Sequence, residues 1–259
     1  MKRFYVVGIL SAIIVLSSFT GLEVKKYQIK TVVIDAGHGG KDPGCHGKAS
    51  HESDVTLKVA LELGRIIKEN CPEVKVVYTR TTDKFVELYD RAAIANKQNA
   101  DLFISIHCNS GPKTASGTET FTMGLHTSDE NLEVAKRENS VILKEDNYQQ
   151  KYDGYDPNSP MAHILMANYQ KAFMENSISF AGKIEKQFKT KLKKNSRGVK
   201  QAGLLVLWKT YMPSVLVEIG FLTNSTEEKY MSNKTNRVYI ASCVYRAFKE
   251  YKKEVETEN

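Results

Sequence analysis

The chain has 259 residues, which is enough for one sizeable domain or two small ones at about 100–200 residues per domain. Hydrophobic residues make up 41% and charged residues 26%, and these values exclude a disordered chain and a polytopic membrane protein. The formal net charge of +7 suits an anionic polymer or surface as a partner, but no Lys/Arg block is long enough to indicate a nucleic-acid binder.

The N-terminal segment has the pattern of an export signal. Lys2 and Arg3 precede an almost wholly apolar run over residues 4–16, and small residues follow it. This pattern predicts a signal peptide over residues 1–21. An uncleaved anchor is the alternative, because a membrane span needs about 20 apolar residues. We therefore expect an exported protein of the periplasm or cell wall, with a membrane as partner only through this segment if it is uncleaved.

The first half of the remaining chain alternates between short apolar runs and amphipathic stretches. In chain order, the predicted elements are a strand at 31–35, a helix from 55 to the Cys71-Pro72 pair, a strand at 74–79, a helix at 91–97, and strands at 102–106 and 117–123. Several strands are continuously apolar, which is typical of a sheet covered on both faces.

The second half begins with a polar stretch, residues 124–158, which is too long for a simple connection and is predicted to be an insertion with a helix at 130–145. The elements predicted after it are a long helix opening at Ser159-Pro160, strands at 204–207 and 215–219, a helix capped by Ser225 with Glu228, and a helix at 234–254. Strands alternating with helices indicate an α/β layered sheet. No linker divides the pattern, so we predict one domain over residues 28–255.

Three apolar strands end in ionisable side chains: His38, His107 and Glu218. Sites in open α/β sheets form beyond the carboxyl ends of the strands, so these groups are expected to meet there. Imidazole and carboxylate are zinc ligands, and a catalytic zinc keeps three protein ligands plus water. Glu52, after the loop of His38, is the expected third ligand, which leaves Glu218 as the base for water.

Each of these residues also has a simpler interpretation. A single His after a strand is more often a hydrogen-bonded structural group, and Glu52 could only complement the dipole of its helix. Glu218 is harder to explain in this way, because a carboxylate inside an apolar strand should be paired, metal-bound or catalytic. The spacing of the set matches no short metal signature. From the chemistry of these residues alone, a mononuclear zinc hydrolase is one interpretation, and separate structural roles for the same residues are the other.

Seven segments, in the same order, resemble the zinc-dependent N-acetylmuramoyl-L-alanine amidases, which cleave bacterial peptidoglycan. They are VVIDAGHGGKDPG (32–44), Glu52 before its helix, YTRTTD (78–83), RAAIAN (91–96), ADLFISIHCNS (100–110), GTETF (117–121) and PSVLVEIGFLTN (213–224). The resemblance covers nearly the whole chain after the N-terminal segment. It implies a mixed six-stranded sheet flanked by helices on both faces.

The resemblance also implies the reaction and the roles of the residues. The reaction is hydrolysis of the amide between the lactyl group of N-acetylmuramic acid and L-alanine of the stem peptide. The ligands of one Zn²⁺ fall on His38, Glu52 and His107, and the catalytic glutamate falls on Glu218. The run His51-Glu52-Ser53-Asp54 departs from the family's Glu-Lys-Asp-like pattern, so His51 is an alternative ligand.

Some relatives carry an insertion at the place of residues 124–158, with a helix that covers the zinc until an activator protein removes it. We expect the same here, with Glu133, Glu138 or Glu145 capping the metal. The alternative is a solvated loop, since charged helical faces are usually solvated. Two further alternatives concern the whole protein: a zinc peptidase acting on stem peptides, and an inactive wall-binding protein. The cysteines are expected to be buried thiols or a bridge.

Overall fold

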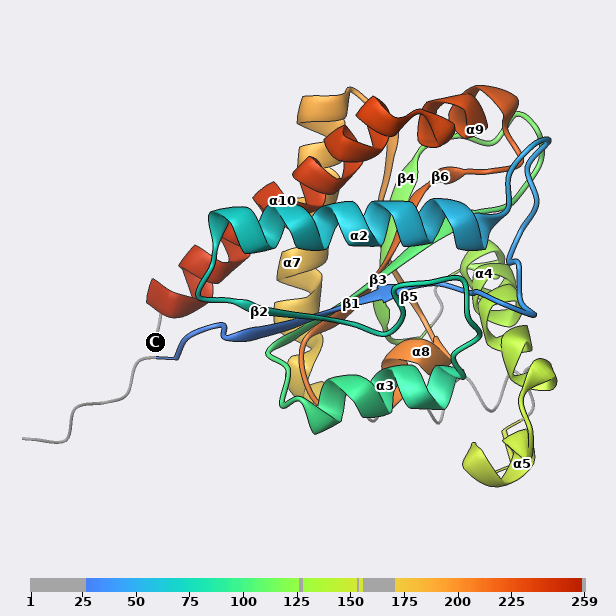
Figure 1. Cartoon of the computed structure of the whole chain (residues 1–259). Helices are drawn as coiled ribbons and strands as arrows, with labels where there is room; N and C mark the ends of the chain where they lie inside the picture. Colours follow the sequence, from blue (N-terminus) through green and yellow to red (C-terminus); the bar gives the residue numbers. More distant parts are fainter. Residues whose placement is uncertain (1–26, 126–127, 153, 156–170, 258–259) are drawn as a thin grey trace, which may run out of the picture.

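The computed structural model describes residues 27–125, 128–152, 154–155 and 171–257, and a six-stranded sheet lies at its centre (Figure 1). The strands are β1 (Thr31–Ala36), β2 (Lys75–Tyr78), β3 (Leu102–Asn109), β4 (Thr118–Met123), β5 (Ser196–Ala202) and β6 (Ser214–Phe221), in the order β2-β1-β3-β6-β4-β5. The first four strands of that order are parallel, whereas β4 runs antiparallel to β6 and parallel to β5. The predicted mixed six-stranded sheet is therefore confirmed.

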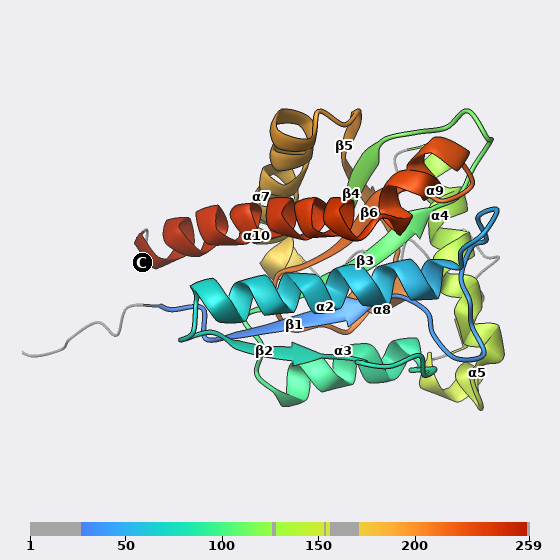
Figure 2. The ribbon, with the colours of Figure 1, turned by 45° about the horizontal axis from the view of Figure 1, so that its top comes forward.

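Helices cover both faces of the sheet, as predicted (Figure 2). Val32 and Ile34 point into a core with α2 (Glu52–Asn70), α7 (Met174–Gln187) and α10 (Lys234–Thr257), whereas Val33 points into a second core on the opposite face. The second core contains residues of α3 (Leu88–Lys97), α8 (Leu205–Trp208) and the insert helix α4 (Asp129–Asn139). Burial on both sides explains why these strands are continuously apolar.

The insert lies at the carboxyl end of β1 (Figure 2). Ligand-binding and active sites of open α/β sheets form at this end of the strands. It consists of α4, a 3₁₀ helix η1 (Ser140–Lys144) and the short α5 (Tyr148–Lys151). Ser128 caps α4 by accepting a hydrogen bond from the backbone N–H of Asn131. Val134, Val141 and Ile142 join the second core, so the described part of the insert is a packed element and not a solvated loop.

The strand predicted at 204–207 is wrong. Leu205–Trp208 forms α8, and its apolar side chains are buried against the sheet. The strand that completes the sheet in its place is β5, Ser196–Ala202, which pairs with β4 at the edge of the sheet. Its polar composition gave no strand signal, because an edge strand with half-exposed side chains does not need an apolar sequence.

The capping box predicted at Ser225 is also wrong. The N-cap of α9 (Ser225–Ser232) is Asn224, whose side chain accepts from the backbone N–H groups of Thr226 and Glu227. Glu228 instead accepts from the backbone N–H groups of Lys48 and Ala49, so it ties α9 to the loop before α2.

Two predicted segments lie partly or wholly outside the described residues. The signal segment, 1–21, is one, and the start of the helix at Ser159-Pro160 is the other. The described part of that region is η2 (Lys171–Phe173), α7 and a π turn η3 (Phe188–Leu192). Within the ranges that the structure describes, no helix has the length and apolarity needed to cross a bilayer. All four cysteines are free thiols.

Candidate metal and catalytic site

His38 lies in the loop that follows β1, with its backbone in the left-handed region at φ 61°. Residues other than glycine adopt this conformation infrequently, and such positions are enriched at functional sites. The loop also passes very close to β3. A Cβ on Gly37 would lie 2.5 Å from the ring of His107, so only glycine fits there.

Two buried arginines fix the carbonyl groups of this loop. Arg91 donates to the carbonyl oxygens of Ala36 and His38 and to the carboxylate of Asp35, which is fully buried. Arg80 donates to the carbonyl oxygen of Gly37 on the other side. Because charge-assisted hydrogen bonds are the stronger ones, these contacts hold the unusual backbone of His38 in place.

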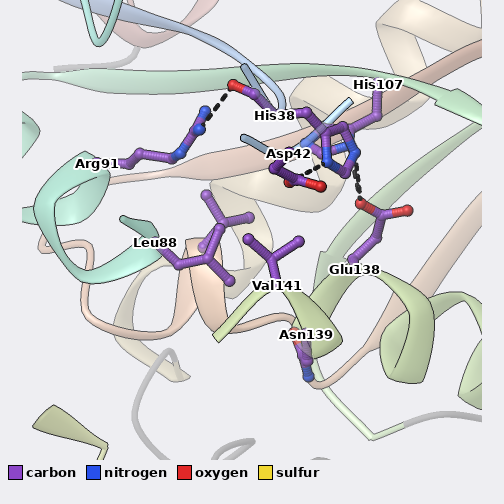
Figure 3. A pocket seen from close by; sticks show the side chains of 9 residues that line it. His38, Asp42, Leu88, Arg91, His107, Glu138, Asn139 and Val141 are labelled. Carbon is purple, nitrogen blue, oxygen red and sulfur yellow. Dashed lines mark hydrogen bonds and ion pairs between the residues drawn. The ribbon is translucent and has the colours of Figure 1, made fainter. Parts of the chain in front are cut away.

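Asp42 orients the ring of His38. Its Oδ2 lies 2.7 Å from Nδ1 of His38, which leaves Nε2 of His38 directed into the site (Figure 3). Ligating histidines usually bond a carboxylate or carbonyl through their other ring nitrogen. Sequence reasoning missed Asp42, although an acid four residues after a candidate ligand in a glycine-rich loop was an available signal.

Glu52 is the first residue of α2 and is fully buried. Its Oε2 accepts from the backbone N–H of Cys45, and its Oε1 accepts from that of Cys108. A carboxylate at a helix N-terminus is also favoured by the dipole. His51 is exposed and faces His46, with Nδ1 atoms 2.9 Å apart. It lies outside the cluster described next.

One cluster brings together His38, Glu52, His107 and Glu138, whose ligand atoms all lie within 4.8 Å of one another. The first three are the predicted ligands, and Glu138 comes from α4 of the insert (Figure 3). Nε2 of His38 lies 3.2 Å from Oε1 of Glu52 and 3.3 Å from Oε2 of Glu138. Nδ1 of His107 lies 3.2 and 3.0 Å from the same two oxygens.

These separations fit a small divalent ion. Zinc–nitrogen and zinc–oxygen bonds of about 2.0–2.2 Å place neighbouring donors of a tetrahedron about 3.4 Å apart. Among the described residues, Nε2 of His38 and Oε2 of Glu138 are buried and make no hydrogen bond of good geometry, despite their close approach. Two nitrogens and two carboxylate oxygens facing one point form a donor set that suits zinc.

The electrostatics of the cluster also favour a cation. Burial by itself would lower the pKa of His107, but the carboxylates of Glu138 and Glu52 outweigh it and raise that pKa to about 9. The pKa of His38 is likewise raised, because Glu52 and the hydrogen bond to Asp42 outweigh its burial. Two carboxylates thus stabilise positive charge at the position where the four donors converge.

Glu218 lies beside the cluster without belonging to it. It pairs in register with His107 on the neighbouring strand, and both side chains are buried. Its Oε1 is 3.2 Å from Nη2 of Arg137 on α4, and within the described chain its Oε2 makes no hydrogen bond. Burial raises the pKa of Glu218 well above its usual value, although Arg137 opposes this.

The other two candidate capping residues lie elsewhere. Glu133 is exposed and pairs with Lys136 on its own helix. Glu145 accepts from the backbone N–H of Leu88 and from the hydroxyl of Tyr152, so it fastens the insert to α3.

The structure leaves little free space in the site. A cavity of about 10 Å³ lies between His38, Arg91 and Glu138, and a second of about 170 Å³ lies on the side of Glu52 and Arg137. Both are smaller than the about 300–1,000 Å³ of an ordinary ligand pocket.

Comparisons with known proteins agree with the fold and identify the family. Residues 32–250 match the sequence profile of the family described as N-acetylmuramoyl-L-alanine amidase, Amidase_3. The chain is 33% identical to the N-acetylmuramoyl-L-alanine amidase AmiA of Escherichia coli over 220 residues, covering 83% of this chain and 73% of AmiA. It is 32% identical to the uncharacterized protein YqiI of Bacillus subtilis over 222 residues, covering 86% of this chain and 84% of YqiI.

A solved N-acetylmuramoyl-L-alanine amidase from Clostridium difficile 630 superposes with a TM-score of 0.64 at 26% identity, covering 87% of this chain and 97% of that one. An α/β sheet with this His/Glu cluster, matched to these relatives, defines a hydrolase of the bacterial cell wall. More particularly, the chain belongs to the N-acetylmuramoyl-L-alanine amidase family, as its sequence resemblance implies.

Proposed function

We propose that the chain is a zinc-dependent peptidoglycan amidase in which His38, Glu52 and His107 hold one Zn²⁺ and Glu218 is the catalytic acid and base. One observation carries this proposal: four donor side chains converge on one position, and the buried Glu218 lies beside them without belonging to the cluster. Zinc, when bound, would lower the pKa of a water to about 7 and polarise the amide carbonyl.

Glu218 would carry out the proton transfers of the reaction. Glu218 removes a proton from the attacking water as the new C–O bond forms at the lactyl carbonyl. It then gives that proton to the nitrogen of L-alanine as the C–N bond breaks. The products are a lactyl carboxylate on the glycan and a stem peptide with a free amine. Burial of Glu218 suits this cycle, because a raised pKa favours the protonated form that serves as the acid.

We propose that the described conformation is a resting state closed by the insert. Glu138 stands where a catalytic zinc keeps a position for water or substrate. Its neighbour Arg137 pairs with Glu218, and Lys144 pairs with Asp42 through a contact of 2.6 Å. Residues of the consecutive helices α4 and η1 therefore contact the proposed metal position, the proposed base and the orienting carboxylate together.

Opening then requires the insert to move, and a partner protein that binds the insert is the proposed activator. Leu125 and Leu143, both exposed on this segment, are apolar side chains available to such a partner. We further propose export, since peptidoglycan lies outside the cytoplasmic membrane and residues 1–21 have the pattern of a signal.

Digestion of purified peptidoglycan tests this function. The zinc-loaded chain is incubated with intact sacculi, and new chain ends are identified by mass spectrometry. New amines on L-alanine support the amidase. New ends inside the stem peptide would instead identify a peptidase. If no new ends form even after the insert has been displaced from the site, the protein is a wall-binding protein.

A further inference from the structure

Arg197 on the edge strand β5 points toward the site because of a β-bulge. Thr118 pairs with Ser196, but Thr120 pairs with Val199, so β5 has one extra residue opposite Glu119. In a regular strand, residues 197 and 199 would face the same side. Here Val199 packs against the core of α2, α7 and α10, whereas Arg197 contacts α4 on the other side. Bulges next to active sites commonly redirect a side chain in this way.

The bulge depends on Gly198, which has φ of +86°. Nothing lies within 4 Å of a Cβ built at this position, so backbone conformation, and not space, calls for glycine there.

The guanidinium of Arg197 is held in a fixed position. Its Nε lies 3.0 Å from Oε2 of the buried Glu119, and its Cζ lies 5.2 Å from the centre of the Phe221 ring. Asn109 donates to the other oxygen of Glu119. These contacts engage Nε and one face of the guanidinium, so the outer nitrogens remain directed toward α4.

Arg197 stands at one end of a row of site residues. Glu119 pairs in register with Glu218, which pairs in register with His107. Neighbouring strands are about 4.8 Å apart, and β4 lies between β5 and β6, so the backbone of Arg197 lies two strand spacings, about 10 Å, from that of the proposed catalytic glutamate. One extended residue spans about 3.3–3.6 Å, so a group two or three residues beyond the scissile amide can reach it.

A carboxylate already occupies this position. Oε2 of Glu130, in the first turn of α4, lies 3.1 Å from Nη2 of Arg197, and 77% of the Glu130 side chain is exposed. So exposed an ion pair adds little to stability, and Glu119 and Phe221 already hold the guanidinium, so the contact with Glu130 is not needed to fix Arg197. The planar fork of arginine is suited to carboxylate recognition.

We propose that Arg197 binds a free carboxylate of the stem peptide, and that Glu130 takes the place of this carboxylate while the insert is closed. The proposal rests on the proposed function, because it extends the same site along the peptide. The carboxylate within reach is the first one that follows L-alanine along the stem peptide, and amidation of this group would remove its charge. Arg197 is thus the residue that distinguishes the free acid from the amide.

The test uses two muramyl peptides that differ only in this group, one with the free carboxylate and one with the amide. The zinc-loaded full chain should cleave the free acid with a kcat/KM at least about tenfold higher, because hydrogen bonds to charged groups are the stronger ones. Arg197→Gln should bring this ratio near one. Arg197→Lys should give an intermediate ratio.

Lys200→Gln, three residues along the same strand, is the matched control and should keep the wild-type ratio. Glu130→Gln should lower KM for the free acid alone. A preference that survives Arg197→Gln, or a wild-type chain without preference, overturns the proposal.

Binding of the two free stem peptides, followed by NMR titration, separates this idea from the proposed function. If neither muramyl peptide is cleaved at L-alanine, even by Glu138→Ala, which lacks the carboxylate that closes the proposed metal site, the amidase assignment fails. The peptide titration still decides on Arg197 in that case: tighter binding of the acid that is lost in Arg197→Gln supports it, and equal binding of both peptides refutes it.

Discussion

Arg137 of the insert helix and Glu218 of the central strand β6 form an ion pair, with Nη2 and Oε1 3.2 Å apart. The next residue, Glu138, faces the two histidines of the cluster. Two adjacent residues of one helix therefore contact the proposed base and the proposed metal position. In the proposed resting state, the insert therefore controls access to the site.

Removing the carboxylate of Glu138 should activate the enzyme. Glu138→Ala is expected to raise the basal rate of dye release from labelled peptidoglycan several-fold, since the fourth donor position is then open to water. Glu133→Ala, on the exposed face of the same helix, should leave the rate unchanged. An unaltered or lower rate in Glu138→Ala, with an unaltered unfolding temperature, would show that the insert does not close the site.

Replacing the proposed base should separate catalysis from metal binding. Glu218→Gln is expected to reduce activity by about 10²–10⁴-fold, the usual effect of losing general acid–base catalysis. Zinc content, measured by atomic emission, should stay near the wild-type value because Glu218 lies outside the donor cluster. Loss of zinc together with activity would make Glu218 a ligand and reverse the assigned roles.

Asp42 should matter for metal affinity without touching the metal. Asp42→Asn weakens the contact that orients the His38 ring, and outer partners of this kind typically contribute 10–100-fold in affinity. Zinc release against a chromogenic chelator measures this effect. Asp42 also pairs with Lys144, so Lys144→Gln is the control, and it should leave zinc affinity unchanged. Equal affinities in Asp42→Asn and wild type would exclude the orienting role.

The buried pair of Arg91 and Asp35 should be a main determinant of stability around the site. Arg91→Leu leaves Asp35 buried without its cation and is expected to lower the free energy of unfolding by about 3–5 kcal/mol. Urea denaturation measures this change. Arg65→Leu, which removes ion pairs on the surface of α2, should have little effect. A loss in Arg91→Leu as small as that in Arg65→Leu would contradict this assignment.

The position of the cluster could be predicted from the order of strands and helices. His38 follows β1, His107 lies near the end of the adjacent parallel strand β3, and Glu52 begins the helix after β1. Topology therefore brings the three together, although their spacing in sequence is irregular. Glu138 could not be chosen over Glu133 in advance. The choice depends on how α4 is rotated against the sheet, and that rotation follows from packing of residues such as Val134.

The edge strand β5 could not be predicted either, and the reason is different. Ser196–Ala202 is polar because it is an edge strand, while the apolar run at Leu205 belongs to a short buried helix. Periodicity does not separate a short buried strand from a short buried helix. The bulge that directs Arg197 toward α4 was also missed, because β5 itself was not predicted, although Gly198 was a visible signal.

The central claim is that two imidazoles and one carboxylate of this chain hold a single zinc ion. X-ray absorption at the zinc edge, combined with metal content of the purified chain, tests it most directly. The account predicts one zinc per chain with two nitrogen ligands, lost in His38→Ala and in His107→Ala and retained in Glu218→Gln. A chain that keeps its full zinc content after both histidines are replaced would contradict it.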